Sequence, residues 1–138
     1  MTLQAFTDGA SRGNPGEAGI GVILKDEHGK VLLTISGYIG RTTNNVAEYT
    51  ALRALLKEMQ RFPCSRLVVH SDSELMVRQM SGSYRVKDPA MKREHAKVAA
   101  ELAGLPCHVE FRHVPRDQNS EADRLANAGI EQRRRVRV

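Results

Sequence analysis

The stretch LVVHSDSELM, residues 67–76, joins an apolar run to a group of polar residues in the middle of the 138-residue chain. The run is continuous rather than alternating, which is typical of a strand buried on both faces of a sheet. In open α/β sheets, ligands bind beyond the carboxyl ends of such strands. Asp72 is therefore predicted at the end of the sheet where a functional site would lie. It could also cap a following short helix, and Ser73 is equally suited to that role.

The segments before this strand predict a meander of three antiparallel strands. LQAFTD (3–8) alternates apolar Leu3 and Ala5 with Gln4 and Phe6, and we expect its strand to end at Asp8. The next eleven residues, GASRGNPGEAG, are rich in Gly and Pro and predict a loop. IGVILKD and KVLLTISGYI then flank EHG, which fits a hairpin with glycine in the turn.

The remaining segments predict helices that alternate with strands. TTNNVAEYTALRALLKEMQRF (42–62) has apolar residues at helical spacing, with Asn45 as a candidate cap. DPAMKREHAKVAAELAGL (88–105) begins with a capping Asp and a Pro, and glycine stops it. HVEFRHV (108–114) alternates as a strand, and NSEADRLANAGIEQ (119–132) predicts the last helix. Strand–helix–strand units require parallel neighbours. We expect an α/β fold: a mixed five-stranded sheet, three antiparallel strands followed by parallel ones, with helices on both faces.

Composition narrows the class of protein. The net charge of +5 favours a nucleic-acid partner without requiring one. No apolar run approaches the ~20 residues that span a bilayer, and no signal peptide is visible, so a cytoplasmic protein without membrane contact is expected. Cys64 and Cys107 have no metal-site spacing; they are either idle thiols or a disulfide between neighbouring loops. We expect one domain over residues 1–130 and an arginine-rich tail over 131–138, which is either frayed or an arm that contacts phosphate.

Four carboxylates are predicted at one end of this sheet. Asp8 and Asp72 follow strands, while Glu48 and Asp123 lie on the sheet-facing stripes of their helices. Each alone has a plainer interpretation as a turn, capping or helix-dipole residue. Together they favour a cation, because neighbouring carboxylates repel unless one lies between them. Oxygen ligands suit Mg²⁺ or Mn²⁺, and two such ions can activate water and stabilise the leaving oxygen of a phosphodiester.

Four motifs carry a resemblance to a known family. FTDGASRGNPG, TTNNVAEYTAL, VVHSDSELMV and NSEADRLAN resemble, in order, the signatures of type 1 ribonuclease H, over a span from Leu3 to about Ala128. The resemblance implies the ribonuclease H-like fold and a monomeric endonuclease. Such an enzyme hydrolyses the RNA strand of an RNA–DNA hybrid with two Mg²⁺ ions, or with Mn²⁺, and leaves 5′-phosphate and 3′-hydroxyl ends.

The resemblance also implies roles for individual residues. Asp8, Glu48, Asp72 and Asp123 match the four metal-binding carboxylates, and Arg116 is the candidate catalytic helper in the place of a loop histidine. His113 is the other candidate for that role. Amide side chains in the groove-facing motifs suit a 2′-hydroxyl, which distinguishes RNA from DNA; the plainer interpretations are a helix cap and a turn. The substrate-binding candidates are Gly13, Asn14, Thr43, Asn44, Asn45, Gln79, Arg85, Lys87 and Asn119.

The chain departs from many family members in three places. It has no Trp, and SGSYRVKDPAM (81–91) takes the place of a longer basic protrusion, so the chain resembles the short form. We also expect no hybrid-binding domain. The loop VPRDQNSEAD is short, and Glu74 stands where many members have Gln, which could donate to a base. Two other classes stay open: a non-catalytic hybrid-binding or double-stranded RNA-binding module, and a resolvase or transposase core on the same architecture.

Overall fold

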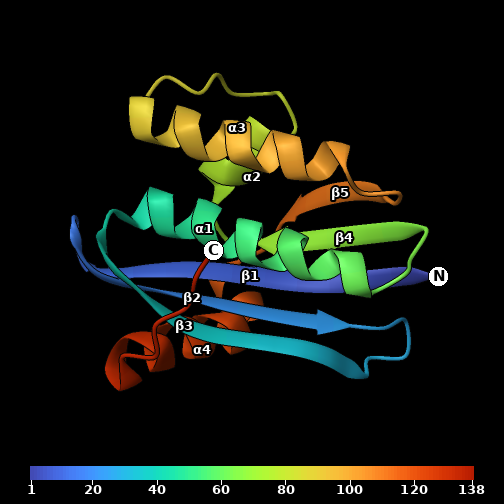
Figure 1. Cartoon of the computed structure of the whole chain (residues 1–138), viewed down its shortest axis with the longest axis horizontal. Coiled ribbons are helices and arrows are strands. Elements are labelled where there is room, and N and C mark those ends of the chain that lie inside the picture. Colours follow the sequence, from blue (N-terminus) through green and yellow to red (C-terminus); the bar gives the residue numbers. More distant parts are fainter.

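A five-stranded mixed sheet forms the centre of the computed structural model, which describes residues 1–138 (Figure 1). The strand order is β3-β2-β1-β4-β5. β1 pairs antiparallel with β2 and β2 antiparallel with β3, whereas β1, β4 and β5 run parallel. The predicted fold class is therefore confirmed. The strands are β1 (Thr2–Gly13), β2 (Gly16–Lys25), β3 (Val31–Thr42), β4 (Arg66–Ser71) and β5 (His108–His113).

The expected end of the first strand at Asp8 is wrong. β1 continues to Gly13, because its antiparallel ladder with β2 extends to the pair Gly13–Gly16. The glycine-rich segment predicted as a loop is therefore mostly strand, and only Asn14 and Pro15 turn the chain. The parallel ladder with β4, however, ends at the pair Thr7–Ser71. Asp8 is thus the first residue beyond the parallel part of the sheet, even though it lies within a longer strand.

Helices cover both faces of the sheet (Figure 1). α1 (Asn44–Glu58), α2 (Glu74–Met80) and α3 (Pro89–Ala103) lie on one side, and α4 (Ser120–Gln132) lies on the other. The short 3₁₀ helices η1 (Met59–Arg61) and η2 (Arg116–Asn119) follow α1 and precede α4. The main core lies between α1 and the sheet and includes Leu3, Leu52, Leu55, Leu67 and Val69, all fully buried. No helix combines the length and apolar character that crossing a bilayer requires.

The helix caps follow the sequence in most places. The Asp88 and Ser73 side chains accept from the backbone N–H groups of Met91 and Met76. The predicted Asn45 cap of α1 is wrong, because Thr43 takes that position and accepts from the Val46 N–H at 3.3 Å.

A second cap differs in a way that matters for the site. No side chain caps α4, so Asp123 is not used as the partner in a capping box. Its carboxylate remains available for another role.

The C-terminal tail is ordered against the sheet. Arg133, with φ 52°, ends α4, and the chain then runs along the edge of β3 toward α1 (Figure 1). The Tyr38 N–H donates to the Arg134 carbonyl at 2.6 Å, and the Val136 N–H donates to the Tyr38 carbonyl at 3.3 Å. Val136 and Val138 pack against the main core. The tail therefore covers an otherwise open strand edge, and the interpretation as a frayed terminus is wrong.

The two cysteines are neighbours at the amino ends of β4 and β5. Both thiols are free and half-buried, so the structure favours the idle-thiol interpretation. Burial, and then the adjacent Cys107, raise the pKa of Cys64 to about 12. A thiol with so high a pKa is a poor nucleophile at neutral pH.

Candidate active site

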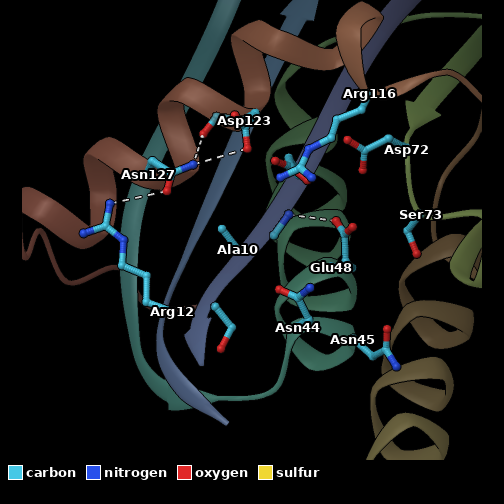
Figure 2. Close-up of a pocket in the computed structure, with 13 residues that line it drawn as sticks. Ala10, Arg12, Asn44, Asn45, Glu48, Asp72, Ser73, Arg116, Asp123 and Asn127 are labelled. Carbon is cyan, nitrogen blue, oxygen red and sulfur yellow. Dashed lines mark hydrogen bonds between the residues drawn. The ribbon is translucent and has the colours of Figure 1, made fainter. Parts of the chain in front are cut away.

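An open polar pocket of about 430 Å³ lies where β1 leaves the parallel ladder (Figure 2). Its lining comes from β1, α1, the residues after β4, η2 and α4, and it holds a single hydrophobic residue, Ala10. Such a lining suits a charged ligand rather than an apolar one. The thirteen lining residues are Asp8, Gly9, Ala10, Ser11, Arg12, Asn44, Asn45, Glu48, Asp72, Ser73, Arg116, Asp123 and Asn127.

Three carboxylates converge at the centre of this pocket. One oxygen each from Asp8, Glu48 and Asp72 lies within 4.8 Å of the others. β1 supplies the first, the first turns of α1 the second and the residue after β4 the third. Asp8 and Glu48 are buried, and Asp72 is half-buried. The pattern of strand ends and helix stripes in the sequence thus placed these three side chains correctly.

Close packing of α1 on β1 aims Glu48 at the pocket. A Cβ on Gly9 would lie 2.3 Å from the backbone of Ala47, so only glycine allows this approach. The Gly9 N–H then donates to the Glu48 carboxylate at 2.7 Å. The glycine after Asp8 therefore does two things, since it admits the helix and orients its carboxylate.

The electrostatics of the cluster favour a bound cation. Burial, followed by the Glu48 and Asp72 charges, raises the pKa of Asp8 to about 9. Burial and the Asp72 charge raise the pKa of Glu48 to about 8, although the hydrogen bond from the Gly9 N–H and the charge of Arg116 act to lower it. Burial also raises the pKa of Asp72, although the hydrogen bond from the Asn119 side chain and the charge of Arg116 act to lower it. Buried carboxylates that repel one another in this way fit a hard divalent cation with oxygen ligands.

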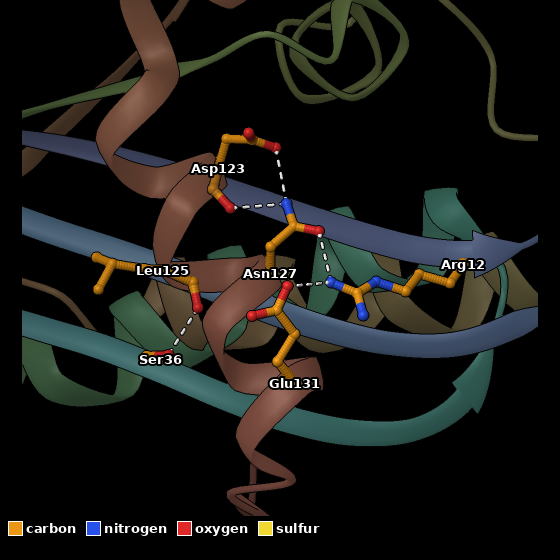
Figure 3. Close-up of polar contacts among 6 residues, drawn as sticks. All are labelled: Arg12, Ser36, Asp123, Leu125, Asn127 and Glu131. Atoms are coloured by element: carbon orange, nitrogen blue, oxygen red, sulfur yellow. Dashed lines mark hydrogen bonds and ion pairs between the residues drawn. The ribbon is translucent and has the colours of Figure 1, made fainter.

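Asp123 lies beside the three-carboxylate group rather than within it. It lines the pocket, and its charge helps to raise the pKa of Asp8. Its Oδ1 accepts from the Asn127 amide at 3.2 Å, and its carbonyl accepts from the same amide at 3.0 Å (Figure 3). On the other side of that amide, Arg12 donates to Asn127 Oδ1 at 3.4 Å and to Glu131 at 2.9 Å. A chain of contacts thus joins β1 to the fourth carboxylate.

The segment before α4 contributes Arg116 and Asn119. Arg116, in η2, extends past Asp72 into the pocket (Figure 2), and its charge favours the ionised forms of Glu48 and Asp72. Asn119 is buried and its amide donates to the Thr7 carbonyl at 2.9 Å, so it ties this segment to β1. His113 ends β5 in an exposed position, from which its charge lowers the pKa of Asp72. Arg116 lines the pocket and His113 does not.

Apart from Asn119, the predicted substrate-binding residues fall into three groups. Asn44 and Asn45 line the pocket rim, next to the capping Thr43. Gly13 ends β1 and Asn14 begins the exposed β1–β2 turn. Asn14 Oδ1 accepts from the Asn44 N–H at 3.1 Å, which fixes the turn against α1. The others lie apart from the pocket: Arg85 and Lys87 are exposed between α2 and α3, and Gln79 is buried with its Oε1 accepting from the Tyr49 hydroxyl at 2.5 Å.

Sequence reasoning missed Arg12 and Asn127. Arg12 was hidden in a segment predicted as a loop, and its reach to α4 depends on the extension of β1. Asn127 carried a usable signal, because it stands four residues after Asp123 and therefore on the same helix face.

Comparisons with known proteins agree with this geometry. Residues 6–129 match the family described as reverse transcriptase-like. A ribonuclease H of Halorhodospira halophila is 35% identical over 94% of this chain and 93% of its own length. A bifunctional protein of Mycobacterium tuberculosis is 42% identical over 95% of this chain. The solved structure of LC11 ribonuclease H1 in complex with an RNA/DNA hybrid superposes with a TM-score of 0.91, at 46% identity, over 94% of this chain and 97% of that one.

The lengths of these relatives differ. The chain spans 36% of the mycobacterial protein but nearly all of the Halorhodospira and LC11 enzymes. The compact connection between α2 and α3, which takes the place of a basic protrusion, fits the short form of the fold. With the sheet order, the convergent carboxylates and these similarities together, the chain belongs to the type 1 ribonuclease H family.

Proposed function

We propose that this chain is an endoribonuclease that hydrolyses the RNA strand of RNA–DNA hybrids and leaves 5′-phosphate and 3′-hydroxyl ends. The observation that carries the proposal is the convergence of Asp8, Glu48 and Asp72 within 4.8 Å in an open polar pocket. A pure binding module would have no use for such a cluster, because it repels phosphate unless cations are bound. Family membership and the hybrid held by LC11 ribonuclease H1 support the same substrate.

Four side chains would hold the metal ions. Asp8 lies centrally and would contact both, while Glu48, Asp72 and Asp123 would complete the two sites. Mg²⁺ is the expected ion and Mn²⁺ the alternative, since both prefer oxygen ligands. When bound, such ions activate a water at neutral pH and stabilise the leaving oxygen of a phosphodiester.

Other residues would bind and orient the hybrid. Arg116 extends over the carboxylates, where its guanidinium can donate to the scissile phosphate or assist product exit. Asn44 and Asn45 present amides at the pocket rim, where an amide can donate to a base edge and accept from a 2′-hydroxyl. That contact would distinguish the RNA strand from DNA. The cytoplasmic location and the monomeric state stay predictions.

One assay tests the proposal. Labelled RNA–DNA hybrid, double-stranded RNA and double-stranded DNA of one sequence are incubated with the protein in Mg²⁺, in Mn²⁺ and in EDTA. We expect cleavage of the RNA strand of the hybrid alone, lost in EDTA, with products that carry 5′-phosphate. Cleavage in EDTA would contradict the metal assignment. Equal cleavage of double-stranded DNA would favour the resolvase-like alternative.

A further inference from the structure

The arginines of the C-terminal tail occupy fixed positions on the surface. Arg133 and Arg135 both lie against the ring of Tyr38, with each guanidinium carbon 5.1 Å from the ring centroid. We call these three residues the tail clamp. Backbone pairing with Tyr38 anchors the tail segment, and the Arg135 guanidinium lies beside Gly40. These contacts restrict the two guanidinium groups before any ligand arrives.

The charge of this surface is only partly balanced. Glu17 pairs with Arg133 at 3.2 Å and accepts from the Tyr38 hydroxyl. The Tyr38 hydroxyl, and then the charges of Arg133 and Arg41, lower the pKa of Glu17. No carboxylate lies within ion-pair distance of Arg135 or Arg41. One acid therefore faces three guanidinium groups, all exposed, and the surface retains an excess of positive charge that suits an anionic partner.

The tail clamp continues the candidate active site. Arg12, which lines the pocket, is the register partner of Glu17, and Glu17 is the register partner of Arg41. On α4, ten residues separate Asp123 from Arg133. At about 1.5 Å per residue this is ~15 Å, or roughly four base steps of a duplex with one phosphate per ~3.4 Å of each strand. A duplex whose scissile phosphate lies in the pocket can thus reach the clamp.

We propose that Arg133 and Arg135 bind the phosphate backbone of the hybrid about four base steps from the cleavage site. The inference rests on the proposed function and extends it to a second contact region on the same substrate. Guanidinium groups suit phosphate oxygens, and their contact with a tyrosine ring lowers the entropy lost on binding. The contact reads backbone charge rather than base sequence. It strengthens hybrid binding in a chain whose compact α2–α3 connection takes the place of a basic protrusion.

The test is the salt dependence of hybrid binding. Affinity for a 20-base-pair hybrid is measured in EDTA, which prevents cleavage, between 50 and 200 mM salt, for the wild type and for Arg133→Gln/Arg135→Gln. For the glutamine pair, we expect the slope of log binding constant against log salt concentration to be less steep by about two. Affinity should drop roughly fivefold to tenfold at 200 mM salt. The turnover number with saturating hybrid and Mg²⁺ should not change. The lysine pair Arg133→Lys/Arg135→Lys should keep most of the slope, because the charge is kept.

A matched control separates local contact from net charge. Arg61→Gln/Arg66→Gln removes the same charge near the amino end of β4, opposite the pocket. If both glutamine pairs change the slope equally, the proposal is overturned, since only overall charge matters. It is also overturned if the tail pair lowers the melting temperature while the slope stays that of the wild type, because the clamp is then structural.

A hybrid of about 20 base pairs that ends two base pairs beyond the preferred cleavage position on the side of the tail clamp, and extends on the other side, gives a second readout. Wild type and the tail pair should bind it equally, and a persisting difference would contradict a contact four steps away. The proposed function fails separately, if the wild type binds the hybrid but does not cleave it in Mg²⁺ or Mn²⁺.

Discussion

Two buried glutamates on the α1 side of the sheet show how differently one residue type can be used. Glu48 and Glu94 each expose 8% of their surface. Glu94, on α3, accepts from Arg53 at 3.0 Å and from Lys97 at 3.2 Å. Glu48, on α1, accepts from one backbone N–H and has Asp8 and Asp72 as neighbours.

The difference separates a fold-stabilising acid from a functional one. The charge of Glu94 is balanced by two cations of the chain, so it joins α3 to α1. The charge of Glu48 is opposed by its neighbours, and Arg116 is the cation that acts on it from within the chain. A carboxylate cluster left this way lowers the stability of the metal-free protein and raises its affinity for divalent cations. The candidate site can bind a cation because its negative charge is not neutralised within the chain, whereas the charge of Glu94 is.

The largest expected effect follows from breaking the functional cluster. Asp72→Asn should lower hybrid cleavage by about three orders of magnitude, because a lost metal ligand removes several kcal/mol of transition-state stabilisation at about 1.4 kcal/mol per factor of ten. Hybrid affinity in EDTA should persist. Initial rates at saturating Mg²⁺ and a binding titration measure the two. Near-normal cleavage by this variant in Mg²⁺ would contradict the metal-site assignment.

Substitution of the two glutamates should change stability with opposite sign. Glu94→Gln should destabilise the protein by about 3 kcal/mol, because Arg53, whose side chain is only 12% exposed, then lacks its charged partner. Glu48→Gln should stabilise the metal-free protein, since it removes a buried charge among like charges. Urea unfolding in EDTA measures both. If both substitutions destabilise by similar amounts, the two glutamates play the same structural role and the distinction is lost.

A smaller effect concerns pH. The pKa of Asp8 is raised to about 9 in the folded protein, so the folded state binds this proton more tightly than the unfolded state does. Its contribution to stability is full below pH ~4 and is lost as pH rises toward ~9. Asp8→Asn should not lose this stability as pH rises, because an asparagine side chain does not ionise.

Melting temperatures in EDTA between pH 5 and 9 test this expectation. The melting temperature of Asp8→Asn should rise relative to that of the wild type as pH increases, and the difference should reach about 5 °C at pH 9. Adding Mg²⁺ should shrink the gap, and a gap that does not depend on pH would rule out the cluster as its source.

The fold was predictable because the sequence pattern of each segment specifies the same element that the whole sheet requires at that position. The continuous apolar run before Asp72, the alternation around Leu3 and the helix stop at Gly104 each specify an element, and their order allows few sheets. The error over residues 9–13 has a physical cause. Glycine and proline usually mark turns, but here Gly9 serves the close approach of α1 to β1.

The site was predictable where a side chain's direction follows from periodicity. Glu48 lies on the stripe of Leu52 and Leu55, so its burial followed from the helix itself. Contacts between elements far apart in sequence carry no such pattern. The 115-residue separation of Arg12 from Asn127, and the passage of the tail along β3, depend on three-dimensional packing and could not be read from spacing.

The smallest expected effect tests whether the fourth carboxylate is held by its neighbours. Asn127→Ala removes one hydrogen bond to the Asp123 side chain, worth about 1 kcal/mol. The turnover number should fall about fivefold and the half-saturating Mg²⁺ concentration should rise, with little change in hybrid KM. The thermal stabilisation that Mg²⁺ gives should also shrink, which is a readout independent of catalysis.

Ser36→Ala is the matched control for Asn127→Ala. The Ser36 hydroxyl donates to the Leu125 carbonyl at 2.6 Å, so it also joins α4 to the sheet but does not touch Asp123 (Figure 3). Ser36→Ala should lower the unfolding free energy by about 1 kcal/mol and leave the Mg²⁺ dependence unchanged. If Ser36→Ala shifts the Mg²⁺ dependence as much as Asn127→Ala does, the position of α4 as a whole sets the metal site, and the Asn127 amide has no specific part in it.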